Sequence, residues 1–183
     1  HHVGPFANVG FDQKVGPEGL DSFDPKKKFS HAGKELSWSR KPEWKNGQLY
    51  GTVLSGVNAA NYLHKLITVA TPRSLPISLG SDNGIKVFLN GKQIHANNAG
   101  RGAAADQEKI TLNLREGENS LLLKIHNQAG PSGFYFRADA QSMAQPALVV
   151  ETQVAKGSVA LEIVAKAKAA RKAKVFWKTK KAN

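Results

Sequence analysis

The stretch from Leu79 to Lys92, LGSDNGIKVFLNGK, constrains the fold more than any other part of the chain. Ile85, Val87 and Leu89 alternate with the residues between them, which predicts a short strand with one buried face and one exposed face. Asn90-Gly91 follows directly and is a strong hairpin signal, because a type I′ turn needs positive φ at both central residues. The stretch is therefore expected to form the end of one strand, a polar turn, a second strand and a hairpin.

The same alternation recurs at short intervals on both sides of this hairpin. It predicts at least seven short strands between residues 60 and 139, separated by turns rich in Gly and Asn. Such spacing is typical of an all-β sandwich. Residues 7–34 show no sustained period and are expected to form a long ordered loop.

The chain is expected to divide into a sandwich module at 1–140, a linker at 141–146 and a C-terminal part at 147–183. Three alternating runs in the last part predict either a short basic three-stranded β extension or a truncated second β domain. The run from Ala165 to Ala173 contains strong helix formers. Its apolar and charged positions alternate by two, which favours a basic hairpin instead.

Charge is unevenly distributed along the chain. The formal net charge is +12, and residues 156–183 hold nine Lys or Arg against one acid. Such a tail attracts polyanions, but a solubilising tail is the simpler interpretation. No apolar run is long enough to span a membrane, no signal peptide is visible, and the absence of Cys excludes disulfides and cysteine metal sites.

Three stretches together resemble one known family. The segments 79–92, Leu114–Lys124 and Gly133–Phe136, with Gly4-Pro5-Phe6 and Gly16-Pro17-Glu18, resemble galactose-binding-like jelly-roll domains. These carbohydrate-binding-module-like domains are appended to large exported proteins of polysaccharide-degrading bacteria. The resemblance covers roughly residues 3 to 139 and implies a jelly-roll β-sandwich beside catalytic domains in an extracellular or periplasmic protein. Asn83 and Phe88 depart from the pattern, where Asp and Trp are common.

Catalysis is not expected from this sequence. It holds no nucleophile elbow, zinc-protease motif or phosphate-binding loop. Asp82 and Asp106 are the best acid pair for a glycosidase, but both lie in turn-type sequence, where Asp commonly caps the backbone. The resemblance leaves a structural Ca²⁺ open, with Asp82 and Asp106 as weak ligand candidates. No other cofactor is expected.

The candidate sugar contacts are aromatic rings for the C–H face of a sugar and polar side chains for its hydroxyls. They are Arg101, Asp106, Tyr135, Arg137, His126, Trp38 and Trp44. Loops on a rigid scaffold commonly bind ligands, and Arg101 is the only cation of loop 96–106. The alternatives are an Arg101–carboxylate pair and core packing of both tryptophans.

These observations favour a non-catalytic carbohydrate-binding or accessory module of a larger secreted polysaccharide-processing protein. The charge suggests that a bound polysaccharide would be acidic or sulfated. The alternative is a structural or protein-interaction β-sandwich that binds no sugar. Binding of nucleic acid through residues 172–181 is a minor alternative, because no nucleic-acid fold accompanies them.

Overall fold

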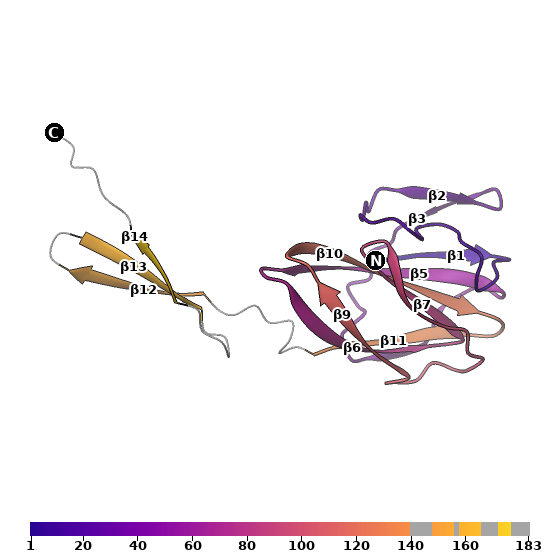
Figure 1. Cartoon of the computed structure of the whole chain (residues 1–183). Helices are drawn as coiled ribbons and strands as arrows, with labels where there is room; N and C mark the ends of the chain where they lie inside the picture. Colours follow the sequence, from indigo (N-terminus) through magenta and orange to yellow (C-terminus); the bar gives the residue numbers. More distant parts are fainter. Residues whose placement is uncertain (140–147, 156–157, 166–171, 177–183) are drawn as a thin grey trace. The chain divides into compact units, whose positions relative to one another are not determined.

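The computed structural model describes residues 1–139, 148–155, 158–165 and 172–176 (Figure 1). The chain forms two compact units, His1–Met143 and Ala144–Asn183. Every regular element in the described residues is a β-strand, which confirms the predicted all-β sandwich class. Within these residues there is no helix that is long and apolar enough to cross a membrane.

The first unit contains two main antiparallel sheets. The five-stranded sheet has the order β1 (His2–Ala7), β5 (Ala59–Val69), β10 (Gly117–Asn127), β7 (Gly84–Leu89) and β8 (Lys92–Asn97). The four-stranded sheet has the order β4 (Leu49–Leu54), β11 (Ser132–Ala138), β6 (Arg73–Ser81) and β9 (Glu108–Leu114). Their facing side chains form the main core, which includes Leu63, Leu79, Val87, Leu112 and Phe134.

The central hairpin forms as its sequence predicts. Asn90 and Gly91 have φ angles of 50° and 77°, and they connect β7 to β8. The side chain of Asn90 also accepts a hydrogen bond from the backbone N–H of Ser120 at 2.9 Å. The turn therefore sets the β7–β8 register and ties the hairpin to the neighbouring strand β10.

The predicted exposed face of β7 is wrong, because all six residues of this strand are buried. Lys86 and Phe88 point away from the main core, but an N-terminal segment that includes Val9, Phe11 and Phe29 covers them. Val9 and Phe29 from that segment pack with Phe88 and Tyr62 in a second core. Alternation by two marks the two faces of a strand, but it does not reveal that a distant segment covers the second face.

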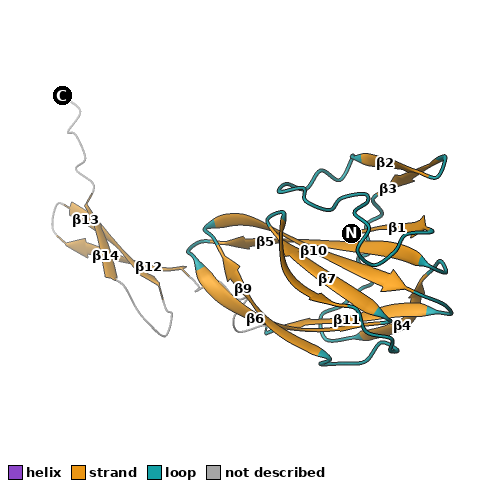
Figure 2. Ribbon diagram, turned by 45° about the vertical axis from the view of Figure 1, so that its right-hand side comes forward, coloured by secondary structure: helices purple, strands orange, loops and turns teal. Residues whose placement is uncertain are grey.

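The expected loop at 7–34 also contains part of a hairpin. This hairpin consists of β2 (Lys28–His31) and β3 (Lys34–Ser37), and Ala32 and Gly33 in its turn have positive φ angles. Both views place this hairpin on the outer side of the five-stranded sheet, beside β1 (Figures 1 and 2). Residues 8–24 together with this hairpin form the N-terminal cover of that sheet.

The second unit contains a three-stranded antiparallel sheet, in the order that the alternating runs of the sequence suggest. Its strands are β12 (Leu148–Ala155), β13 (Ser158–Ala165) and β14 (Lys172–Phe176). The predicted linker at 141–146 and the basic residues 166–171 lie outside the described residues.

Candidate functional site

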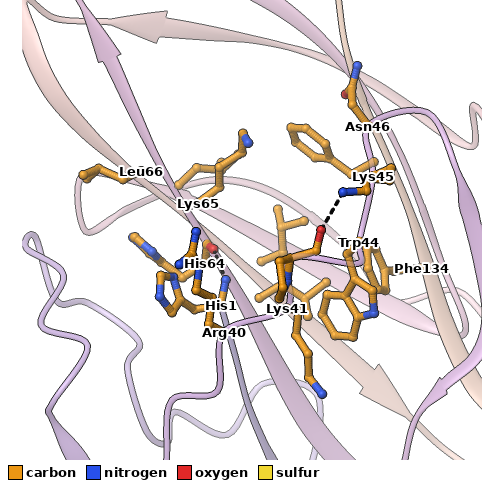
Figure 3. A pocket seen from close by; sticks show the side chains of 15 residues that line it. His1, Arg40, Lys41, Trp44, Lys45, Asn46, His64, Lys65, Leu66 and Phe134 are labelled. Atoms are coloured by element: carbon orange, nitrogen blue, oxygen red, sulfur yellow. Dashed lines mark hydrogen bonds between the residues drawn. The ribbon is translucent and has the colours of Figure 1, made fainter.

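A pocket of about 370 Å³ opens between the two sheets beside the segment 40–46 (Figure 3). Its floor consists of apolar side chains of β5, β10 and β11. These are Leu63, Leu121, Leu123, Phe134 and Phe136. We call this hollow the basic pocket, because four cationic residues form its rim. They are Arg40, Lys41, Lys45 and Lys65.

The four rim cations differ in the partners that the protein provides for their charged groups. The Nζ of Lys45 donates a hydrogen bond to the carbonyl oxygen of Pro42 at 2.8 Å. Lys41 lies 3.9 Å from a carboxylate oxygen of Glu43 and 5.6 Å from the centroid of the Trp44 ring. The side chains of Arg40 and Lys65 form no ion pair with any residue that the structure describes.

The charged side chains that line this pocket are cationic. No acidic side chain of the described residues lines it. Burial lowers the pKa of the amino group of His1, and the nearby charges of Lys65 and Arg40 lower this pKa further. Burial disfavours a charge of either sign, whereas the charges of Lys65 and Arg40 favour a negative group, so these two cations make the pocket suitable for an anion.

Trp44 lies between the apolar floor and the basic rim. It is half-buried, and its ring packs against Phe134 with 4.8 Å between the ring centroids. The hydroxyl of Tyr50 accepts a hydrogen bond from the backbone N–H of Lys45 at 2.7 Å and donates one to the carbonyl of Glu43 at 2.8 Å. These contacts hold the rim segment against β4, so Trp44 has a fixed position.

Among the predicted sugar contacts, only Trp44 lines the basic pocket. Trp38 instead packs against the second core, with its ring 5.9 Å from Phe29 and 5.3 Å from Phe23. Core packing, the alternative for both tryptophans, therefore describes Trp38. Trp44 combines partial core packing with an exposed part in the pocket.

His126 lies on the face of β10 beneath the N-terminal cover. It is buried, and its Nε2 is 2.8 Å from the carbonyl oxygen of Val9. Burial lowers the pKa of this imidazole, which disfavours its charged form. A ligand would reach His126 only after displacement of the cover.

Arg101 is engaged by a carboxylate, as the alternative for this residue proposed. It donates hydrogen bonds to Glu108 at 2.7 Å and to the hydroxyl of Ser81 at 3.1 Å. Glu108 also lies 2.9 Å from His95 and 2.7 Å from the side-chain amide of Asn97. Because His95 and Asn97 belong to β8 and Glu108 to β9, this cluster joins the adjacent edges of the two sheets.

The last three candidates belong to the outer side of the four-stranded sheet. Asp106 has a φ of 58°, accepts a hydrogen bond from Ser78, and lies 3.3 Å from the guanidinium of Arg137. Tyr135 is on the same face of β11 as Arg137, but it is buried. The structure thus brings Asp106 and Arg137 together, and their role in binding stays a prediction.

The metal candidates do not form a ligand cluster. No group of three or more acidic, His or Cys side chains that could hold a metal ion occurs in the described residues, so Asp82 and Asp106 belong to none. Burial raises the pKa of Asp82, which shows that no neighbouring cation outweighs the loss of solvent there.

A buried ammonium group holds the N-terminal cover in place. Lys124 is fully buried on β10, and its Nζ donates to the carbonyl oxygens of Phe11 at 3.0 Å and Gln13 at 2.7 Å. It also lies 2.9 Å from Glu18, which accepts a second hydrogen bond from Tyr62. Two backbone carbonyls and a carboxylate thus accept hydrogen bonds from this ammonium.

Sequence reasoning missed the four rim cations. Arg40, Lys41 and Lys45 surround Trp44 in one short run, and such a mixture of basic and aromatic residues is a usable signal. Lys65 carries no such signal. It lies in an ordinary strand pattern, and the fold alone brings it to the pocket.

No protein-family model matches the chain, and no curated protein sequence matches it. Solved structures with weak similarity include the PA14 domain of the MpAFP antifreeze protein, at 13% identity and a TM-score of 0.39, over 46% of this chain and 45% of that one. A β-glucosidase from Kluyveromyces marxianus in complex with glucose shows 11% identity and a TM-score of 0.38, over 75% of this chain and 15% of the other.

A putative β-galactosidase from Bacteroides fragilis shows 17% identity and a TM-score of 0.35, over 88% of this chain and 28% of the other. The matched region therefore spans less than half of each of these three chains. Similarities at these TM-scores carry no argument about the function of this protein. The resemblance to galactose-binding-like domains stays a prediction.

Proposed function

We propose that this chain is a non-catalytic carbohydrate-binding module that binds an acidic or sulfated glycan in the basic pocket. One observation carries the proposal: an apolar floor, a half-buried tryptophan and four cations converge on one hollow that no described acid lines. Concave sites with an apolar lining and a few converging polar groups are the usual form of small-ligand sites. The whole protein would be a larger secreted polysaccharide-processing protein with neighbouring catalytic domains, as the family resemblance implies.

Each part of the pocket has a role in this proposal. The C–H face of a sugar ring would pack on Trp44, which is already held by Phe134. The sulfate or carboxylate of that sugar would lie near Arg40 and Lys65, whose charges have no anionic partner among the described residues. Asn46 would lie beside the bound sugar at the pocket wall.

The non-catalytic role has support from the chemistry of the pocket. Hydrolysis of a glycosidic bond commonly uses two carboxyl groups that flank the bond. The described side chains that line the basic pocket provide neither. A sugar held there would therefore be bound without a pair of described carboxyl groups in position to cleave it.

Affinity electrophoresis in gels that contain heparin, alginate or neutral dextran tests the proposal. The variant Arg40→Ala/Lys65→Ala is compared with Lys26→Ala/Lys92→Ala, in which two exposed lysines outside the pocket are removed. We expect retardation by at least one acidic polymer, and a loss of about tenfold or more in affinity only in the first variant. Because both variants keep every other basic residue, including those of the C-terminal part, equal retardation of both would place the binding outside the basic pocket.

A structural module that binds no sugar is the second candidate. Leu49 and Val53 are 46% and 43% exposed on the outer face of β4, which is an edge strand of its sheet. An exposed apolar edge of this kind fits a protein contact better than a sugar. No retardation by any of the three polymers, together with a native thermal melt, would favour this candidate.

A further inference from the structure

A second hollow lies on the outer face of the four-stranded sheet. Its volume is about 690 Å³, and β6, β9 and β11 provide most of its lining. In the strand register Arg137 pairs with Ser78, and Ser78 pairs with Lys109, so these three side chains form one row across the sheet. Pro76 and Thr111 pair in the next row on the same face. We call this hollow the outer groove.

The chemistry of the outer groove differs from that of the basic pocket. Hydroxyl and cationic side chains alternate along its floor, and no aromatic ring of the described residues lines it. Arg137 is partly neutralised by Asp106 at 3.3 Å, whereas Lys109 is exposed. Asp139 is the one acid among the described lining residues. Such a surface suits hydrogen bonds to sugar hydroxyls and an occasional anionic group, and it offers no stacking platform.

The two hollows adjoin at Asn46, and we call the segment Asn46-Gly47 the saddle. Asn46 lines both of them, with Lys45 next to it in the basic pocket and Gly47 next to it in the outer groove. Asn46 is fixed there, because its side chain exchanges two hydrogen bonds with the backbone of Ala138, at 2.9 and 2.8 Å. Gly47 has a φ of 76°, and a Cβ at this position would meet only the side chain of Arg137, at 3.9 Å. The saddle therefore has no side chain at position 47.

We propose that the basic pocket and the outer groove are two parts of one extended site that binds an internal stretch of a glycan polymer. This inference rests on the proposed function. A charged sugar unit lies in the basic pocket, the chain crosses the saddle at Asn46 and Gly47, and the following units lie along Lys109 and Thr111, which are exposed. The protein then recognises polymers by length as well as by charge.

Heparin fragments of increasing length, from a disaccharide to an octasaccharide, provide the test by isothermal titration calorimetry on the full chain. We expect the octasaccharide to bind about tenfold more tightly than the shortest fragment that binds. The variant Lys109→Ala/Arg137→Ala should lose this gain and keep its affinity for the short fragment, whereas Lys26→Ala/Lys92→Ala should keep both. The control is needed because a longer polyanion also gains affinity from additional binding registers.

A substitution on the saddle separates a continuous site from two independent ones. Asn tolerates the left-handed backbone that Gly47 adopts, so Gly47→Asn places a side chain on the saddle with little backbone strain. We expect weaker binding of the octasaccharide by about tenfold and unchanged binding of the short fragment. If Gly47→Asn keeps both affinities, or if the groove variant keeps the length dependence, the extended site is wrong and the proposed function stands. If neither heparin fragments nor alginate fragments of any length bind, both proposals fail.

Discussion

Two regions of this protein present the same kind of side chain in opposite settings. Under the N-terminal cover, the ammonium of Lys124 is fully buried, and its three donors meet Phe11, Gln13 and Glu18. At the basic pocket, Arg40 and Lys65 form no ion pair with the described residues. The chain has thus provided oxygen ligands for Lys124, whereas none of the described residues forms an ion pair with Arg40 or Lys65.

This difference separates a structural cation from one that is available to a ligand. A buried charge is tolerated only where paired groups replace its lost hydration. Cations at the rim of an open pocket keep part of their hydration, so they need no partner for the protein to fold. The network at Lys124 should therefore govern stability with little influence on binding, and the rim cations should do the reverse.

The largest expected effect is the loss of the buried ammonium. Lys124→Met removes the donor of two backbone carbonyls beneath the cover and leaves Glu18 with Tyr62 as its donor and without a cation. We expect the free energy of unfolding to fall by about 3–5 kcal/mol, as is usual when one partner of a buried pair is removed. Urea denaturation measures the change. In the control Lys86→Met the abandoned partner is Asp12, which is exposed, so the loss should be much smaller.

The pair of variants can also contradict the comparison. Equal losses in Lys124→Met and Lys86→Met would show that burial of the partner carboxylate does not determine the effect. At a temperature where Lys124→Met remains folded, its affinity for heparin should equal that of the unchanged protein.

A second effect concerns His64, which stacks on Phe23 of the cover with 3.7 Å between the ring centroids and also lines the basic pocket. Burial lowers the pKa of His64 to about 3, whereas an unfolded His titrates near pH 6.5. The unfolded state therefore takes up the proton first. The stability that His64 contributes is fully present above about pH 6.5 and falls as the pH decreases toward 3, by up to about 1.4 kcal/mol per pH unit.

Urea midpoints near neutral pH and near pH 5 measure this dependence. His2 and His126 add to it with the same sign, because burial also lowers their pKa values. The variant His64→Phe keeps the stacking on Phe23 and should show a shallower loss of stability with acid. An unchanged slope in this variant would mean that His64 does not cause the dependence.

A third effect is the reverse of the first. Arg40→Ala/Lys65→Ala should change the free energy of unfolding by no more than about 0.5 kcal/mol, as is usual for exposed positions without partners. Its affinity for heparin should fall about tenfold, or about 1.4 kcal/mol. Denaturation and titration on the same sample provide both values. A large loss of stability here would show that the rim cations have structural roles.

The smallest effect on stability is expected from a change at Asp12, the exposed partner of Lys86. Asp12 accepts a hydrogen bond from Lys86 at 2.9 Å, and this contact lowers the pKa of the carboxyl group. The contribution of Asp12 is present above its unfolded pKa and is lost as the pH falls through its folded value. Asp12→Asn should lower the midpoint of thermal unfolding slightly, and added salt should reduce the difference between the two proteins. A shift as large as that of Lys124→Met would contradict this expectation.

Much of the fold was predictable from local pattern. The hairpin at Asn90-Gly91 and the strands at β5 and β6 follow from alternation and turn chemistry, both of which act between neighbouring residues. The burial of the outer face of β7 was not predictable, because Lys86 on that face is covered by a segment that is distant in the sequence. An isolated Lys on an alternating strand has the pattern of an exposed residue, whether or not another segment later covers it.

The candidate site likewise has a part that the sequence predicts and a part that depends on the tertiary structure. By itself the sequence determined the strands, the turns and the basic run around Trp44, because these depend on residue type and short spacing. Only the tertiary structure decided that Lys65 lies at the same pocket as that run, that Glu108 pairs with Arg101, and that Lys124 lies beneath the cover. Each of these contacts joins residues from different strands or loops, and their positions depend on the packing of the complete sandwich.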